Sequence, residues 1–221
     1  MKMNIIFSGP PGSGKDEACE FLKRKYNFRH LQFKDDLFIE TAEYFKVSLE
    51  WFMSYYNDRR IKERPEPQLN GMSRREAMIH VSENIIKPRK GKDYFGLKTA
   101  AKIDDEHSYC CFSDGGFIEE VIPLINRVGV DNICIVQLYR IGCSFSSDSR
   151  TYIDGSIPQE EYGKFHSSTV NKNHRISLPI RMYRIHNNTS VSDFHNYIRQ
   201  IIRKEANVYE KSSSHLCGKS L

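Results

Sequence analysis

The sequence lacks any apolar run that could cross a bilayer, because its apolar stretches are far shorter than the ~20 residues that a spanning helix needs. It also lacks a signal-peptide pattern ahead of its first apolar run. Its six cysteines show no C-x-x-C spacing, which argues against a zinc site or disulfides and favours reduced, buried thiols. We therefore expect a soluble intracellular protein, and 221 residues are enough for one domain with a full core.

Patterns of base-driven catalysis are missing as well: the sequence shows no Ser-His-Asp arrangement, no cluster of metal ligands and no protein-kinase catalytic loop. Acidic residues are the minority, 28 against 33 basic ones, for a net charge of +5. The basic residues clump at 23–25, 59–60, 74–75 and 87–92, which suits a polyanionic small substrate. The surplus also permits nucleic-acid binding, but no nucleic-acid motif accompanies it. We expect neither specific nucleic-acid binding nor membrane binding.

Residues 9–16 read GPPGSGKD and carry the clearest motif of the chain. The spacing G-x-x-x-x-G-K is typical of a phosphate-binding loop, in which glycines let backbone N–H groups turn inward and the lysine reaches the terminal phosphates. A compact apolar run at 3–8 predicts a buried strand before the loop, and helical spacing follows from Asp16. The order strand, glycine turn, helix predicts a nucleotide phosphate site; the alternative is a glycine turn with a solvated lysine.

Asp16 departs from the usual pattern of this loop. The residue after the lysine is normally Ser or Thr, whose hydroxyl binds Mg²⁺. A carboxylate can hold Mg²⁺ directly or through water. We therefore expect Asp16 to be a metal ligand.

The remaining patterns predict alternating strands and helices. We expect strands at 30–33, 109–113, 132–139 and 180–186, and helices at 37–45, from 73 to a stop at Pro88, at 93–103, from 117, and after 190, with a loop at 57–72. Together with the phosphate loop, this order predicts an α/β fold: a P-loop three-layer sandwich with a five-stranded parallel sheet flanked by helices. We expect a single domain over 1–210 and a flexible tail at 211–221.

Arg74 and Arg75 lie in the first turn of the predicted helix that begins with the capping box Ser73-x-x-Glu76. Unpaired positive charge is unfavourable there because of the helix dipole. An anionic ligand would resolve the conflict. The alternative is that these arginines pair with nearby acids such as Glu66 or face water.

Asp114 follows a predicted central strand, where side chains face the ligand crevice of an open α/β sheet. It is a candidate ligand of Mg²⁺ or water, or a partner of substrate or loop groups; the alternative is a cap of the helix that starts near Phe117. From 140 to 178 the chain is polar, as in a functional lid or a disordered loop. Arg140 and Arg150 are candidates to stabilise a phosphoryl group in transfer.

Taken together, these features resemble the P-loop nucleoside monophosphate kinases, and most closely the bacteriophage deoxynucleoside monophosphate kinases. The residues that carry the resemblance are 9–16 with aspartate after the lysine, 73–76, 91–95, 112–117 with Glu119 and Glu120, Arg140, 148–150, and 187–189 before the last helix.

The resemblance implies an enzyme that uses ATP and Mg²⁺ to phosphorylate a (deoxy)nucleoside 5′-monophosphate, in the cytoplasm, or in the host cytoplasm if it is phage-encoded. It implies an acceptor-binding helical region at about 35–105 and a lid at about 140–178. The residue roles that it implies are Gly12, Ser13, Gly14 and Lys15 for the ATP phosphates, Arg75 or Arg74 for the acceptor phosphate, Asp35 or Lys34 in the acceptor pocket, Arg140 and Arg150 as lid arginines, and Asn187 and Asn188 on the adenine side.

Many relatives carry an arginine just after the aspartate that Asp114 matches, whereas this chain has Gly115-Gly116. Another cation must take over that role, or the role is absent. Three other functions stay open: a kinase for another small metabolite, such as a phosphomevalonate-type kinase, a nucleotide-binding module without turnover, and a nucleic-acid-binding protein that uses the basic clusters. The oligomeric state is open too, a homodimer included.

Overall fold

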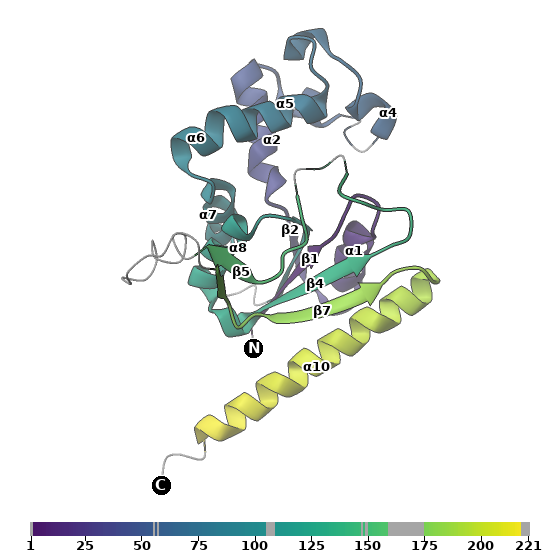
Figure 1. Cartoon of the computed structure of the whole chain (residues 1–221), viewed down its shortest axis with the longest axis vertical. Helices are drawn as coiled ribbons and strands as arrows, with labels where there is room; N and C mark the ends of the chain where they lie inside the picture. The colour runs from purple at the N-terminus through teal and green to yellow at the C-terminus, as the bar shows by residue number, and fades with distance from the viewer. Residues whose placement is uncertain are drawn as a thin grey trace.

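Five parallel strands form the central sheet of the computed structural model, which describes residues 2–54, 56, 58–104, 109–146, 148, 150–158 and 175–217 (Figure 1). Their order across the sheet is β2-β3-β1-β4-β7. The strands are β1 (Met3–Ser8), β2 (Arg29–Leu31), β3 (Tyr109–Gly115), β4 (Ile133–Tyr139) and β7 (Arg181–His186). The predicted five-stranded parallel sheet is confirmed.

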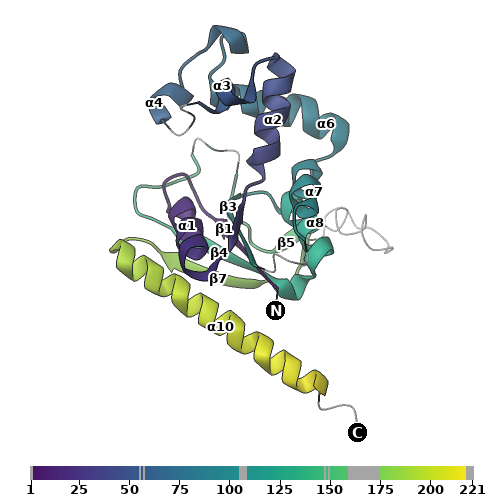
Figure 2. The same cartoon turned by 180° about the vertical axis from the view of Figure 1, so that it is seen from behind.

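Helices cover both faces of the sheet, because the fully buried residues of β1 alternate between two cores. Ile5 and Phe7 pack with α1 (Lys15–Tyr26) and α10 (Val191–Cys217). Ile6 points to the other face and packs with α7 (Tyr94–Ala101) and α8 (Ile118–Val128). The result is the predicted three-layer sandwich, with α10 running along β7 and past the sheet in Figures 1 and 2.

A helical region stands beyond one edge of the sheet and has apolar clusters of its own (Figures 1 and 2). Its elements are α2 (Lys34–Phe45), α3 (Leu49–Met53), α4 (Arg59–Lys62), η1 (Pro67–Leu69), α5 (Arg74–His80), η2 (Val81–Ile86) and α6 (Lys87–Lys90). The prediction of a loop over 57–72 was therefore incomplete, since α4 and the short 3₁₀ helix η1 lie within it. The predicted capping box at Ser73 and Glu76 is confirmed.

Pro88 does not end the helix that begins at Arg74, contrary to the prediction. The chain passes from α5 through η2, a π-helical turn, into α6, and it leaves the helix only at Gly91, where φ is 99°. Proline has no backbone N–H and cannot complete an ordinary helical hydrogen bond. The wider π turn and the position of Pro88 in the first turn of α6 accommodate that missing donor.

The predicted lid at 140–178 begins with a segment that is bound to the sheet. The backbone N–H of Ile153 donates to Ser8 Oγ (3.0 Å), and its carbonyl accepts from Gln137 Nε2 (2.8 Å). Farther on, β5 (Ser156–Pro158) pairs with β6 (Arg175–Ser177) in antiparallel fashion, while 159–174 lie outside the described residues.

Helix α10 continues to Cys217, so most of the segment expected to be a flexible tail has helical backbone. Across the described ranges, the structure contains no helix with the length and apolar character needed to span a membrane.

Candidate active site

The loop between β1 and α1 requires glycine at Gly12 and Gly14, whose φ values of 83° and 105° lie in the left-handed region. Glycine is also required at position 14 for a steric reason, because a Cβ there would lie 2.5 Å from Asn187 Nδ2. Helix α1 starts directly afterwards at Lys15, so its free N–H groups and the positive end of its dipole face the loop. This is the geometry of an anion-binding turn.

Lys15 is buried and folded back onto the loop. Its ammonium donates to Gly9 O (2.6 Å) and Pro10 O (2.8 Å). Burial, followed by the positive charge of Arg150, lowers the pKa of Lys15 to about 8. An anion bound next to the ammonium would counter both effects.

A cavity of about 540 Å³ opens at this loop and extends to the helical region. Five cationic side chains line it: Lys15, Lys34, Lys62, Arg75 and Arg150. Six acidic residues share the lining: Asp16, Glu63, Glu83, Asp114, Glu120 and Asp148. The cavity therefore joins the predicted phosphate loop to the predicted acceptor residues Arg75 and Lys34.

Asp148 joins cations that come from distant parts of the chain. Its carboxylate binds Arg150 in bidentate fashion (Nη2–Oδ2 2.5 Å, Nε–Oδ1 2.9 Å), and Arg75 Nη2 lies 3.7 Å from the same Oδ2. Although burial raises its pKa, the hydrogen bonds and charge of Arg150 bring the pKa of Asp148 down to about 2. The carboxylate thus stays ionised and holds Arg150 close to Arg75.

Arg150 also fills the space beside the Gly115-Gly116 pair. A Cβ on Gly116 would lie 2.5 Å from Arg150 Cγ and Cδ, so only glycine lets this side chain pack here. The guanidinium is therefore built into the cavity wall next to Asp114. The segment that carries it is anchored to the sheet through Ile153.

Asp114 uses both carboxylate oxygens to hold the start of α2, since Oδ1 accepts from Phe33 N (3.1 Å) and Oδ2 from Lys34 N (2.9 Å). The expected alternative, a cap of α8, was wrong, because Asp114 caps α2. Lys34 lines the cavity there. Next to it, burial and the charge of Asp114 raise the pKa of the half-buried Asp35.

The two arginines of the first turn of α5 have different surroundings. Arg74 is buried, pairs with Glu66 (2.9 Å) and lies 4.7 Å from the ring centroid of Trp51. The alternative of pairing with Glu66 therefore describes Arg74, and its suggested contact with the acceptor phosphate does not fit this environment. Arg75 lines the cavity and lies 3.8 Å from Glu63.

Asn187 and Arg140 bind the backbone of the phosphate loop, whereas Asn188 binds the backbone of the segment that follows β4. Asn187 is buried, and its Nδ2 donates to Ser13 O (2.9 Å). Arg140 is exposed and donates to Gly12 O (3.1 Å), while Asn188 Oδ1 accepts from Ile141 N (2.8 Å). The side chain of Asn187, expected on the adenine side, is thus occupied by the loop backbone.

Comparison with known proteins gives likenesses to solved structures, two of which follow. No protein-family model and no curated protein matches the chain. It is similar to a presumed kinase of Chloroflexus aurantiacus, with 12% identity over 92% of this chain and 97% of that chain and a TM-score of 0.45. It is also similar to a gluconokinase of Sinorhizobium meliloti, with 12% identity over 96% of this chain and 98% of that chain and a TM-score of 0.43. At these values any assignment of function rests on the geometry of the site.

Asp16 fits the role of a magnesium ligand. Its side chain lines the cavity beside Gly12 and Lys15, at the end where phosphates would lie. Mg²⁺ keeps several waters and is commonly bound by one or two carboxylates together with substrate phosphates. Within the described residues there is no group of three or more His, Cys, Asp or Glu side chains arranged to hold a metal ion. Asp114, the other predicted metal ligand, already accepts backbone N–H groups with both of its carboxylate oxygens, so Asp16 is the carboxylate that we assign to Mg²⁺ beside bound phosphates.

Two residues of the cavity were missed by sequence reasoning. Lys62 lies in α4, within the stretch expected to be a loop. Burial and the charges of Arg75 and Lys34 lower its pKa to about 8. Asp148 was noted only as part of a motif, and its contact with Arg75 joins residues 73 positions apart in the sequence. A polar segment rich in basic residues was the only sequence signal for Lys62.

Proposed function

We propose that the protein transfers the γ-phosphoryl group of ATP to the 5′-phosphate of a (deoxy)nucleoside monophosphate. The observation that carries this proposal is the single cavity in which the Lys15 loop and the Arg75 region face each other, with Arg150 next to both. The charge of Arg150 lowers the pKa of Lys15, and its partner Asp148 reaches Arg75. A cation placed between a donor and an acceptor phosphate suits phosphoryl transfer, which depends on positioning and on charge around the moving group.

The cations have separate roles in this mechanism. Lys15 and the N–H groups of the loop hold the β- and γ-phosphates, while Arg75 and Lys34 hold the acceptor phosphate. Mg²⁺, bound with ATP at Asp16, would neutralise part of the phosphate charge. Arg150 stabilises the charge on the phosphoryl group as it moves, and it takes the place of the arginine that many relatives carry after the aspartate. The attacking oxygen is already anionic, so no strong general base is needed.

The remaining candidates support these groups. Asp114 fixes Phe33 and Lys34 at the start of α2, which places Lys34 in the cavity. Asn187 fixes the shape of the phosphate loop, Arg140 binds the loop at Gly12 O, and Asn188 is our candidate for the adenine side.

An acceptor panel tests the function. Purified protein with ATP and Mg²⁺ is given each nucleoside and deoxynucleoside monophosphate in turn, and ADP release is measured. We expect turnover with at least one of them. Release of ADP only with a different phosphorylated acceptor would favour a phosphomevalonate-type kinase. ATP binding without ADP release from any acceptor would indicate a nucleotide-binding module.

The Arg75→Ala change should raise the KM for the acceptor far more than the KM for ATP, by about tenfold to a hundredfold. The reason is that Arg75 faces the acceptor end of the cavity, where a charge-assisted hydrogen bond to phosphate is lost. Steady-state kinetics with each substrate varied in turn measure the two constants. Equal increases in both would assign Arg75 to the support of the helix.

Arg74→Met is the matched control for that measurement. It should leave the acceptor KM nearly unchanged and lower the free energy of unfolding by about 2 kcal/mol, since Glu66 loses its buried partner. Denaturant unfolding measures this cost. A large rise in acceptor KM for Arg74→Met at unchanged stability would reverse the two assignments.

Binding of ATP at pH 8 should be accompanied by uptake of up to about half a proton at Lys15, because a pKa of about 8 leaves half of the free ammonium groups deprotonated. The triphosphate raises this pKa, so ATP affinity falls as the pH rises from about 7 to 10. Calorimetry in two buffers of different ionisation enthalpy counts the protons. Lys15→Arg, which stays protonated, should show no uptake; equal enthalpies for the parent protein in both buffers would refute this assignment.

A further inference from the structure

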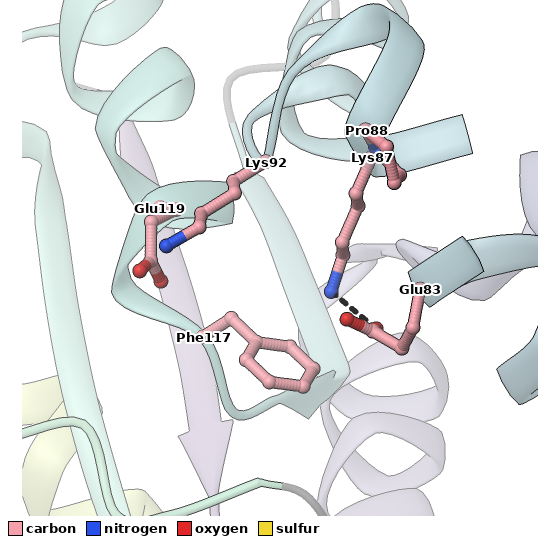
Figure 3. Close-up of a pocket in the computed structure, with 6 residues that line it drawn as sticks. All are labelled: Glu83, Lys87, Pro88, Lys92, Phe117 and Glu119. Carbon is pink, nitrogen blue, oxygen red and sulfur yellow. Dashed lines mark hydrogen bonds and ion pairs between the residues drawn. The ribbon is translucent and has the colours of Figure 1, made fainter. Parts of the chain in front are cut away.

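A second, smaller pocket of about 340 Å³ lies between the π-helical turn with α6 and the start of α8 (Figure 3). Glu83, Lys87, Pro88, Lys92, Phe117 and Glu119 line it. Glu83 and Phe117 also line the main cavity, so the two spaces share a wall. The side pocket therefore adjoins the main cavity at these two side chains.

Lys87 is a charged residue whose side chain is largely buried and held in a fixed position in the side pocket. Its side chain is only 10% exposed, its ammonium donates to Glu83 Oε1 (2.7 Å), and its Nζ lies 4.1 Å from the ring centroid of Phe117. Glu83 Oε1 also accepts from Ser82 Oγ (3.0 Å), which leaves Oε2 as the oxygen with capacity for a ligand. Figure 3 shows Lys87 and Glu83 pointing toward each other at the pocket, with the Phe117 ring beside them.

The unusual helix geometry helps to place this pair. Glu83 lies in η2 and Lys87 opens α6, one turn later, where Pro88 removes a backbone donor. π turns of this kind occur frequently at functional sites because they redirect side chains relative to a regular helix. Here the turn carries Ser82 and Glu83 into the lining of the main cavity.

The charge of the side pocket differs from that of a phosphate site. Its two lysines, Lys87 and Lys92, are balanced by Glu83 and Glu119, and Figure 3 shows Lys92 pointing toward Glu119. A phosphate or carboxylate group would gain little net attraction there and would meet two carboxylates. An uncharged group with donors and acceptors on its edge fits better, and the ring of Phe117 favours a flat one.

We propose that this side pocket holds the base of the acceptor nucleotide, with the base against Phe117 and one edge at Lys87 and Glu83. This inference rests on the proposed function and adds the residues that recognise the acceptor. Nucleobase edges present acceptors next to N–H donors. The Lys87 ammonium donates to an acceptor on that edge, and Glu83 accepts from the neighbouring N–H. Acceptors that carry a carboxylate instead of a base are disfavoured by Glu83 and Glu119.

Comparison of a nucleotide with its base-free analogue tests the proposal. The kcat/KM is measured for the best deoxynucleoside monophosphate from the acceptor panel and for 2-deoxyribose 5-phosphate, with ATP saturating. The parent enzyme should prefer the nucleotide by about a hundredfold or more. Phe117→Ala should lower kcat/KM for the nucleotide by about tenfold to a hundredfold and leave that for 2-deoxyribose 5-phosphate unchanged.

Lys87→Met and Glu83→Gln should show the same selective loss for the nucleotide. Lys90→Met is the matched control: Lys90 lies on the same helix but pairs with Glu40 on the outside, so this change should leave both acceptors unaffected. Phe117→Leu keeps an apolar side chain and provides a second variant if the alanine protein does not fold. It should lose less of the preference for the nucleotide.

The outcomes separate the two claims. If the parent enzyme phosphorylates nucleotides, but the Phe117 and Lys87 variants lose activity equally with both acceptors, or lose none, the side pocket is not the base site and only the present inference falls. If the parent enzyme phosphorylates no nucleoside monophosphate, the proposed function falls, and this inference with it.

Discussion

Replacing Lys15 with alanine is expected to lower turnover roughly a thousandfold or more while the protein still unfolds cooperatively. The ammonium is the cation placed closest to the loop that receives the terminal phosphates. It is held there by Gly9 O and Pro10 O. Burial of this ammonium disfavours the charged form, as its lowered pKa shows, so its removal should not weaken the fold.

Two measurements separate the lost catalysis from lost structure. Single-turnover rates with ATP and the best acceptor give the chemical step, and thermal unfolding gives the stability. Lys23→Ala is the matched control, because Lys23 is an exposed lysine in the last turn of the same helix. A Lys15→Ala enzyme within tenfold of the parent would remove the assigned role.

Arg150→Ala is expected to lower kcat by about 10³- to 10⁵-fold with little change in the KM for ATP. Its guanidinium is held in place by the bidentate contact to Asp148 and by its packing on Gly116. A cation positioned in advance stabilises the transferred phosphoryl group without reorganisation during the reaction. Loss of this charge should also raise the pKa of Lys15, since Arg150 is its second-largest lowering influence.

The control variant for Arg150→Ala is Arg140→Ala. Arg140 is exposed and binds the carbonyl of Gly12, so its loss should act mainly on the KM for ATP. Steady-state kinetics of both variants over pH 7 to 10 measure kcat, the KM for ATP and the inflection that belongs to Lys15. If Arg150→Ala kept kcat within tenfold of the parent and left the inflection in place, Arg150 would be only a structural partner of Asp148.

The sequence predicts the sheet well because its central strands are continuous apolar runs, and such runs are typical of strands buried on both faces. Strand β1 shows this, with every residue buried. The phosphate loop is equally predictable from the sequence, because the spacing of Gly12 and Gly14 reflects a local requirement for positive φ. The strands and the glycine conformations of the loop depend on local sequence, and the structure confirms both.

The cavity is less predictable because it depends on contacts between distant segments. Nothing near Asp148 in the sequence indicates that its carboxylate meets Arg75 as well as Arg150. The prediction for Pro88 failed because a π turn can absorb a missing donor that would end an ordinary helix. Arg74 and Arg75 are adjacent and chemically alike, and only the packing of Trp51 and Glu66 distinguishes them.

The most direct test of the account follows the phosphoryl group itself. The protein is incubated with Mg²⁺, ATP labelled at its γ-phosphate and a deoxynucleoside monophosphate from the panel, and the products are separated by chromatography. We predict that the label appears in the deoxynucleoside diphosphate and that Lys15→Ala abolishes its formation. Label that stays in ATP, or that is released only as inorganic phosphate with every acceptor, would contradict the account.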